Sequence, residues 1–138
     1  MEAKSNFSVP SSIPELVVAP DRTQVFMFSA ATWNRHHIHY DKDAAIAEGF
    51  PDVVVQRGLI GNFLARLLTN WLGKDGEIRA LSWKVTQSAF PGTRLRCRGQ
   101  AVAIERSDTA DTVSCELSVV DDGDRTVATG TARVLIYR

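Results

Sequence analysis

Eight apolar residues dominate the segment from Gly58 to Leu72 and limit what this chain can fold into. They stand at positions 59, 60, 63, 64, 67, 68, 71 and 72, as adjacent pairs that recur every four residues. This spacing puts a wide apolar stripe along one face of an α-helix. Gly73 follows the last pair and is a suitable C-terminal stop. The pattern therefore predicts a long helix whose stripe has to be covered by another element.

The residues after this helix predict a run of β-strands, at 77–88, 94–105, 112–120 and 126–137. Turn signals separate them: FPGT, the polar RSDTAD, and DDGD. In the third strand, Val113, Cys115, Leu117 and Val119 alternate with polar residues. This alternation is typical of an antiparallel sheet with one covered face and one wetter face.

The residues before the helix predict less regular structure. Residues 1–14 are rich in Ser, Pro and Asn and indicate a loose N-terminal arm, and 23–29 (TQVFMFS) is rich in β-formers and predicts a strand. A short helix is expected to begin near Asp41, which can cap it, and to end at Gly49. The simplest arrangement is an α+β fold, a single domain over 1–138 in which an antiparallel sheet wraps around one long helix.

Composition excludes several classes of partner. Lys plus Arg equals Asp plus Glu at 16 each, so nucleic acid and anionic membrane surfaces are poor candidates. No apolar run approaches the ~20 residues of a membrane span, and the N-terminus lacks the apolar core of a signal peptide. We expect a cytoplasmic protein whose two cysteines, Cys97 and Cys115, are small buried hydrophobes.

The segment NRHHIHYD, residues 34–41, holds all three histidines of the chain within four positions. A zinc site needs three or four converging ligands, and HHIH is too tight to converge without partners from elsewhere. The nearby carboxylates, Asp41 and Asp43, complete a poor tetrahedral set, so we expect neither a metal nor another cofactor. For His36 and His37, the favoured interpretation is that they are solvated or packed against the core.

His39 differs from the other two histidines. It lies between Ile38 and Tyr40, which can anchor it on both sides within an otherwise polar loop. A neutral imidazole held in this way is a useful proton acceptor near pH 7.

The segment FSAATWNRHHIHYDKDAAIAEGFPDVVVQRGLIGNFLARLL resembles the MaoC-like, or (R)-specific enoyl-CoA hydratase, family. Its first part has the form Ser-Ala-x-Thr-(aromatic)-Asn-x-His-x-Ile-His-Tyr-Asp. This form resembles the corresponding segment of hydroxyacyl-thioester dehydratases. The resemblance implies a hot-dog fold, in which a long central helix is wrapped by an antiparallel sheet. It is dense from about residue 26 to 72.

The resemblance places the catalytic His on His39 and the catalytic Asp position on Asn34. Hydrating a 2-enoyl thioester requires a water aimed at C3, a group that takes its proton, and donors for the developing enolate oxygen. His39 would be the base, and Asn34 could orient the water. The start of the long helix would supply the donors, and Gly58 would leave room for the thioester carbonyl, although an ordinary helix-start glycine is an equal alternative.

Three further residues are candidates for binding the substrate. Gln56 and Arg57 stand where most relatives have His-Gly, and Arg57 could also contact a phosphate. Phe63 lies on the apolar stripe and could line an acyl tunnel, although such a stripe is more often plain core.

The expected function is an (R)-specific hydratase or dehydratase of an acyl thioester, carried by CoA or by an acyl carrier protein. One alternative is a non-catalytic or half-catalytic subunit of a heteromeric hydratase. Another is a hot-dog thioesterase, for which Glu48 and Asp52 precede the helix but no acid lies within it. Because a lone sheet has exposed edges, we expect a homodimer or a heterodimer with a second hot-dog chain.

Overall fold

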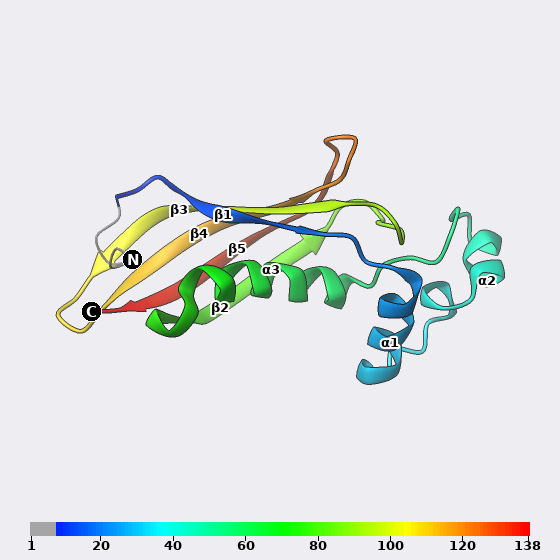
Figure 1. Cartoon of the computed structure of the whole chain (residues 1–138), viewed down its shortest axis with the longest axis horizontal. Coiled ribbons are helices and arrows are strands. Elements are labelled where there is room, and N and C mark those ends of the chain that lie inside the picture. Colours follow the sequence, from blue (N-terminus) through cyan, green and yellow to red (C-terminus); the bar gives the residue numbers. More distant parts are fainter. Residues whose placement is uncertain (1–7) are drawn as a thin grey trace.

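The computed structural model describes residues 8–138 and contains one five-stranded antiparallel sheet in the order β1-β3-β4-β5-β2. The elements are β1 (Ser11–Val18), α1 (Arg22–Thr32), α2 (Lys42–Ala47), α3 (Arg57–Leu72), β2 (Gly76–Val85), β3 (Leu95–Arg106), β4 (Ala110–Val120) and β5 (Thr126–Tyr137). Figure 1 shows α3 lying along one face of the sheet, with α1 and α2 beyond one end of it. This is the hot-dog arrangement of sheet and helix, so the predicted fold class is confirmed.

The long helix α3 is anchored by its apolar stripe. Seven of its buried residues are large hydrophobes and belong to the core: Leu59, Ile60, Phe63, Leu64, Leu67, Leu68 and Leu72. Gly61 also faces inward, because a Cβ there would overlap the Trp83 indole of β2. The spacing of the pairs predicted the helix correctly, with Arg57 one residue before the expected start.

The four predicted strands are also confirmed, with their ends shifted by a few residues. The largest difference is in β2, which ends at Val85 instead of residue 88. The short helix α2 begins after Asp41, whose carboxylate accepts a hydrogen bond from the Ala44 N–H at 3.2 Å. Gly49, with φ +96°, lies just beyond it, as expected for a helix stop.

The predicted strand at 23–29 is wrong, because these residues lie within α1. Asp21 caps this helix through a 2.7 Å bond from the Gln24 N–H. Its buried residues, Val25 and Ser29, are four apart, which is a helical spacing. Phe26 and Met27 are more than half exposed, so the β-forming composition of the segment does not reflect a covered sheet face.

The loose arm predicted for residues 1–14 is also wrong from Ser11 onward, since β1 begins there and pairs with β3. Residues 1–7 lie outside the described part of the chain. Pro14 is tolerated because β1 is an edge strand, and the register shifts between Ile13 and Leu16. The burial of Ile13, at 4% exposed, holds the strand against the core.

Cys97 of β3 and Cys115 of β4 are buried and free. Burial raises the pKa of the Cys97 thiol to about 12 and that of Cys115 to about 11. Both thiols are therefore protonated at neutral pH, and the prediction of small buried hydrophobes is confirmed.

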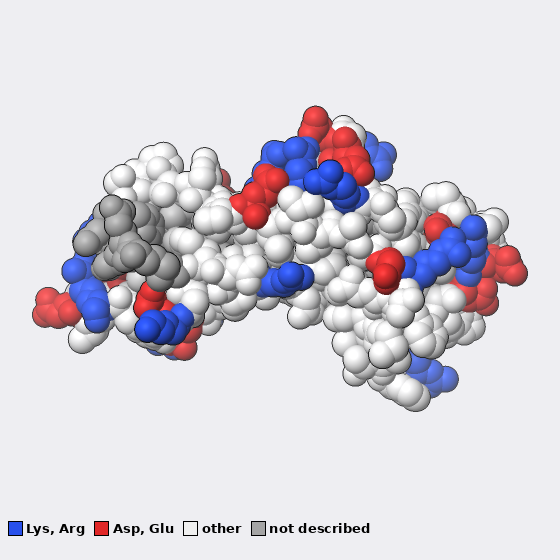
Figure 2. Space-filling view, in the orientation of Figure 1, with Lys and Arg blue, Asp and Glu red and all other residues white. Residues whose placement is uncertain are grey.

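Charged side chains of both signs are intermixed on the face shown in Figure 2. Several pair directly, including Arg22 with Asp52 and Arg98 with Glu15, both at 2.9 Å. This mixture agrees with the balanced composition of the chain. The helices within residues 8–138 are all too short or too polar to cross a bilayer.

Candidate active site

The histidine segment folds into a compact turn between α1 and α2. Trp33, in the left-handed region at φ 59°, ends α1, and the Asn34 N–H donates to the Ser29 carbonyl at 3.0 Å. A 3₁₀ turn follows over His37–His39. The capping of α2 by Asp41 closes the segment. The turn therefore has fixed boundaries on both sides, although its sequence is polar and has no helical period.

His39 is half-buried and is attached to the segment that leads into α3. Its Nδ1 lies 2.6 Å from the carbonyl oxygen of Val54. A carbonyl only accepts hydrogen bonds, so Nδ1 carries the proton. In the neutral ring, Nε2 is then left with a lone pair that can accept a proton.

The surroundings of His39 also keep the ring neutral. Burial lowers its pKa below the ordinary value of 6.5. The hydrogen bond to Val54 opposes this effect, and the nearby charge of His36 lowers the pKa further. A ring with a lowered pKa and a fixed Nδ1 proton has the protonation state that a general base needs at pH 7.

His36 and His37 are both exposed and serve the turn itself. The His36 Nδ1 accepts a long hydrogen bond from the Ile38 N–H, at 3.4 Å. The His37 ring meets the Tyr40 ring edge-on, with centroids 5.7 Å apart. These contacts agree with the interpretation of His36 and His37 as solvated loop residues.

Asn34 and His39 line two neighbouring hollows. Asn34 lines an apolar one of about 160 Å³, and His39 lines another of about 270 Å³ that also includes Arg22 and Lys42. The rings of Phe26 and Tyr40 line both. The Asn34 Oδ1 accepts a 3.3 Å bond from the His36 N–H, so the amide faces the turn that carries the histidines.

The sequence indicates Tyr40 only as an anchor of His39, and it does not identify Phe26 as a residue near the candidate site. Phe26 falls within the segment predicted as a strand, and Asp21, a common N-cap residue just ahead of it, is the signal that could have indicated a helix. The Val54 carbonyl was also missed, because a main-chain acceptor leaves no mark in the sequence.

Gln56 does not reach the surface, contrary to its assignment as a substrate-binding residue. It is 1% exposed, and its Nε2 donates to the Val25 carbonyl and the Ser29 hydroxyl of α1. Phe63 is 3% exposed and belongs to the core cluster, so the core interpretation of the stripe replaces the tunnel for this residue. Both residues are buried by tertiary packing that the sequence alone does not show. Gln56 is covered by α1, and Phe63 lies in the core between α3 and the sheet.

Arg57 is exposed and forms a reciprocal contact with Trp83. Its guanidinium lies 4.7 Å above the indole and donates to the Trp83 carbonyl at 2.8 Å, while the indole N–H donates to the Arg57 carbonyl at 3.0 Å. This clamp fixes the start of α3 to β2. The guanidinium has further N–H donors, so Arg57 remains a candidate for contacting an anionic part of the substrate.

Gly58, in the first turn of α3, packs against the Phe28 ring of α1. A Cβ at this position would lie 3.1 Å from the ring. The first N–H groups of a helix have no partner within it and point toward its start, where they can bind an anion. The glycine is thus explained in part by packing against α1, and its catalytic assignment stays a prediction.

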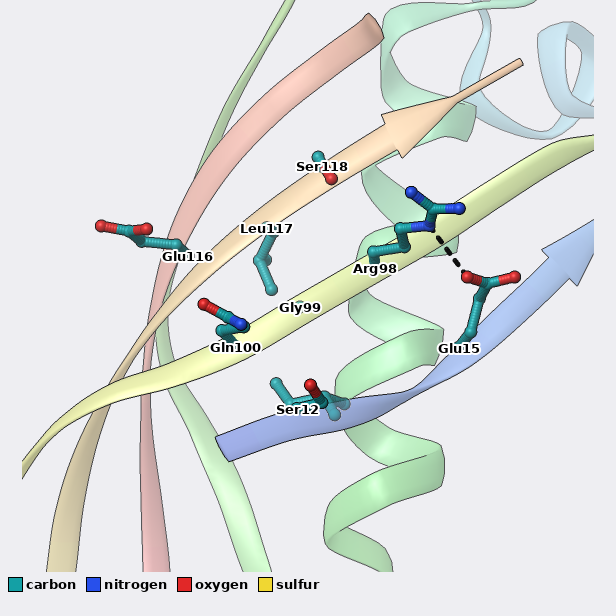
Figure 3. Close-up of a pocket in the computed structure, with 9 residues that line it drawn as sticks. Ser12, Glu15, Arg98, Gly99, Gln100, Glu116, Leu117 and Ser118 are labelled. Carbon is teal, nitrogen blue, oxygen red and sulfur yellow. Dashed lines mark hydrogen bonds and ion pairs between the residues drawn. The ribbon is translucent and has the colours of Figure 1, made fainter. Parts of the chain in front are cut away.

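A larger hollow than these two lies elsewhere, over β1, β3 and β4 (Figure 3). It measures about 490 Å³, and the Arg98–Glu15 ion pair stands at its side. In Figure 3, α3 runs behind these strands. Neither His39 nor Asn34 lines it, so its size does not make it the active site. Within residues 8–138, no group of three or more His, Cys, Asp or Glu side chains could hold a metal ion.

Similarity to known proteins identifies the family of this chain. The sequence model of the family "Hydroxyacyl-thioester dehydratase type 2" matches residues 2–91, which include α1, the histidine turn and α3. The chain belongs to this family. The expected resemblance is therefore confirmed, and the chain is a member of a hydratase and dehydratase family.

Two curated relatives are named as a subunit of a CoA hydratase and as a CoA hydratase. The 3-oxo-4,17-pregnadiene-20-carboxyl-CoA hydratase beta subunit of Mycobacterium tuberculosis is 24% identical over 70% of this chain and 74% of its own length. Mesaconyl-C(4)-CoA hydratase of Chloroflexus aurantiacus is 45% identical over 36% of this chain. The second match spans only 18% of that longer protein.

Solved structures show the same fold at low identity. A MaoC-like dehydratase from Rhodospirillum rubrum has a TM-score of 0.86 at 17% identity, covering 100% of this chain and 98% of that one. The (R)-hydratase from A. caviae has a TM-score of 0.84 at 21% identity, covering 94% and 96%. One chain of the ChsH1–ChsH2 complex from Mycobacterium tuberculosis has a TM-score of 0.83 at 21% identity, covering 95% of this chain and 98% of that one.

Proposed function

We propose that this chain catalyses the (R)-specific addition of water to a 2-enoyl thioester, and the reverse dehydration, with His39 as the general base. The observation that carries the proposal is the 2.6 Å contact of the His39 Nδ1 with the Val54 carbonyl, which leaves Nε2 free to accept a proton. The lowered pKa of His39 supports it, because the ring is neutral at pH 7. Loss of the conjugated-thioester absorbance, measured over a panel of trans-2-enoyl-CoA substrates, tests the proposal.

The chemistry balances with His39 alone as the proton carrier. Nε2 takes a proton from the water as its oxygen bonds to C3, and the electrons of the double bond move to the thioester oxygen. The enolate then re-forms the thioester carbonyl as C2 is protonated, and the proton held by His39 Nε2 can be the one transferred to C2. The N–H groups of the first turn of α3, with Gly58 leaving room beside them, would stabilise the enolate oxygen.

The names of both curated relatives support a CoA thioester as the substrate. Lys42 and Arg22 line the hollow of His39, and Arg57 stands at the start of α3. These cations suit a substrate that carries negative charge. The cations suit the phosphate of either carrier, so we favour acyl-CoA over acyl carrier protein on the names of the relatives, and a parallel assay with both carriers decides between them.

Asn34 is expected to orient the water that attacks C3. Asn34→Ala is expected to lower kcat by roughly 10²-fold, because a misplaced water wastes the base. Asn34→Asp restores the residue that the resemblance leads one to expect, and it should keep or raise kcat. Wild-type kcat in Asn34→Ala would show that Asn34 does not act on the water.

A non-catalytic or half-catalytic subunit is the second candidate. Phe26, Met27 and Trp33 are 54%, 58% and 75% exposed, and such an apolar surface suits contact with another chain. The ChsH1–ChsH2 neighbour is a complex of two different chains. In this candidate, His39 would need a partner chain to complete its site.

Assembly is expected to be dimeric in either case. In the sheet of residues 8–138, β1 and β2 are the edge strands, and the outer side of an edge strand can pair with a strand of another chain. We expect a homodimer, or a heterodimer with a second hot-dog chain, in light-scattering measurements of mass at micromolar concentration. A monomer with full activity would contradict this prediction.

A thioesterase is less well supported by the acidic residues. Burial acts to raise the pKa of Asp52, but hydrogen bonds from Arg22 and the Val53 N–H outweigh it, so the pKa is lowered. The carboxylate is therefore paired and weakly basic. It is a poor nucleophile or base compared with the neutral ring of His39.

A further inference from the structure

The side chain of Gln56 is a buried polar group that the proposed reaction leaves unused. It stands at the N-cap position of α3 but makes no side-chain hydrogen bond to that helix. Its Nε2 donates instead to the Val25 carbonyl at 2.5 Å and to the Ser29 hydroxyl oxygen at 2.8 Å. Because the Val25 carbonyl can only accept, the orientation of the amide is determined: its NH₂ group faces α1.

Ser29 connects Gln56 to the loop that contains Asn34 and His39. Its carbonyl accepts from the N–H groups of Trp33 and Asn34, the residues at which α1 ends and the loop begins. On the other side, Val54 lies two residues before Gln56 and accepts from His39. The segment 54–56 therefore attaches His39 through a carbonyl and the Asn34 end of α1 through an amide.

The amide is present despite an unfavourable feature. Within the described residues, the Gln56 Oε1 is buried and has no hydrogen-bond partner. A buried amide oxygen without a donor destabilises a fold, and an apolar side chain of similar size would avoid this cost. The donor contacts to α1 are thus a better explanation for Gln56 than the filling of space.

We propose that Gln56 is a positioning residue of the hydratase site. It holds α1 against the start of α3, so that Asn34 keeps its place relative to His39, and it does not touch the substrate. The inference rests on the proposed function, since it assigns Gln56 a part in the same reaction. It also replaces the expected role of Gln56 in substrate binding.

The decisive variant is Gln56→Glu, which keeps the shape of the side chain. Only the protonated carboxyl group can donate to the Val25 carbonyl, and the ionised form repels it. Burial favours the protonated form, so the contact should survive at low pH and break as the pH rises through the ionisation. We expect kcat close to that of the wild type at the low end and at least about tenfold lower at the high end, with KM within about threefold.

The neighbouring charges do not produce this alkaline loss by themselves. Both groups that touch the amide, on Val25 and Ser29, are uncharged. Arg57, the next residue, is turned to Trp83. Protonation of His39 as a base would remove activity at low pH and not at high pH.

Two other variants serve as controls. Asn70→Asp adds the same charge at an exposed position of α3 and should keep the wild-type pH profile. Ser29→Ala removes one of the two acceptors and is a milder change. It should lower kcat several-fold at every pH and leave KM unchanged.

A second readout does not depend on activity. The rate of amide hydrogen exchange at Trp33 and Asn34 should increase more steeply with pH in Gln56→Glu than in Asn70→Asp. Coincident pH profiles and coincident exchange in these two variants would overturn the proposal, as would a change in KM with kcat unaffected. If no form of the protein hydrates any enoyl thioester, the proposed function is wrong, and the exchange rates still decide whether Gln56 holds the end of α1.

Discussion

His39→Ala is expected to lower kcat for hydration by about 10²–10⁴-fold, because it removes the group that takes the proton from water. His37→Ala is the matched control. His37 is exposed on the same turn and packs against Tyr40, so its loss should change kcat little. Steady-state kinetics on the best enoyl-CoA substrate measure both effects. Wild-type turnover in His39→Ala would show that His39 is not the base, and it would favour an accessory-subunit role for this chain.

The pH profile gives an independent test of the same residue. The pKa of His39 is lowered below 6.5, and the neutral ring is the active base. The value of kcat/KM should therefore be level around pH 7 and fall only on the acid side of 6.5, as His39 becomes protonated. A decline that begins well above this value would mean that a different group limits the reaction.

Leu67→Asp is expected to destabilise the protein by at least about 4 kcal/mol. Leu67 is 1% exposed in the middle of the α3 stripe, so the variant loses apolar packing and buries an unpaired carboxylate. A loss of this size is a large part of the stability of a typical domain, about 5–15 kcal/mol. Denaturant unfolding followed by circular dichroism measures it.

Asn70→Asp is the control for Leu67→Asp, since it places the same charge on the exposed side of the same helix. It should change the free energy of unfolding by no more than about 0.5 kcal/mol. Equal stability of the two variants would show that the stripe is not the core of the fold.

The parts of the fold that the sequence predicted are those with a regular hydrophobic period. The pairs from Leu59 to Leu72 define α3, and the alternation around Cys115 defines β4, because each buries one face against a large partner. The helix α1 was missed since Val25 and Ser29 are its only fully buried residues, while Phe26 and Met27 are exposed. The strand β1 was missed because Pro14 is read as a breaker, and only its edge position makes it acceptable.

Candidate site residues could be proposed from the sequence where they lie in a local motif. The orientation and protonation of their side chains could not, because contacts with residues far along the chain determine them. His39 could be singled out from its place in one short segment, and the family resemblance of that segment added Asn34. The direction of the Gln56 amide depends on α1, which is 27 residues away at Ser29. The protonated nitrogen of His39 depends on a carbonyl 15 residues away. No local pattern contains either contact.

The stereochemistry of the product tests directly whether this chain is an (R)-specific hydratase that uses His39 as its base. The protein, in whatever oligomeric form it has, is incubated with trans-2-enoyl-CoA substrates of increasing chain length, and the 3-hydroxyacyl-CoA formed is oxidised by dehydrogenases specific for the (R) or the (S) product. We expect that at least one substrate is hydrated, that the product is the (R)-3-hydroxyacyl-CoA, and that His39→Ala forms almost none. An (S) product, or equal yields from the wild type and His39→Ala, would contradict it.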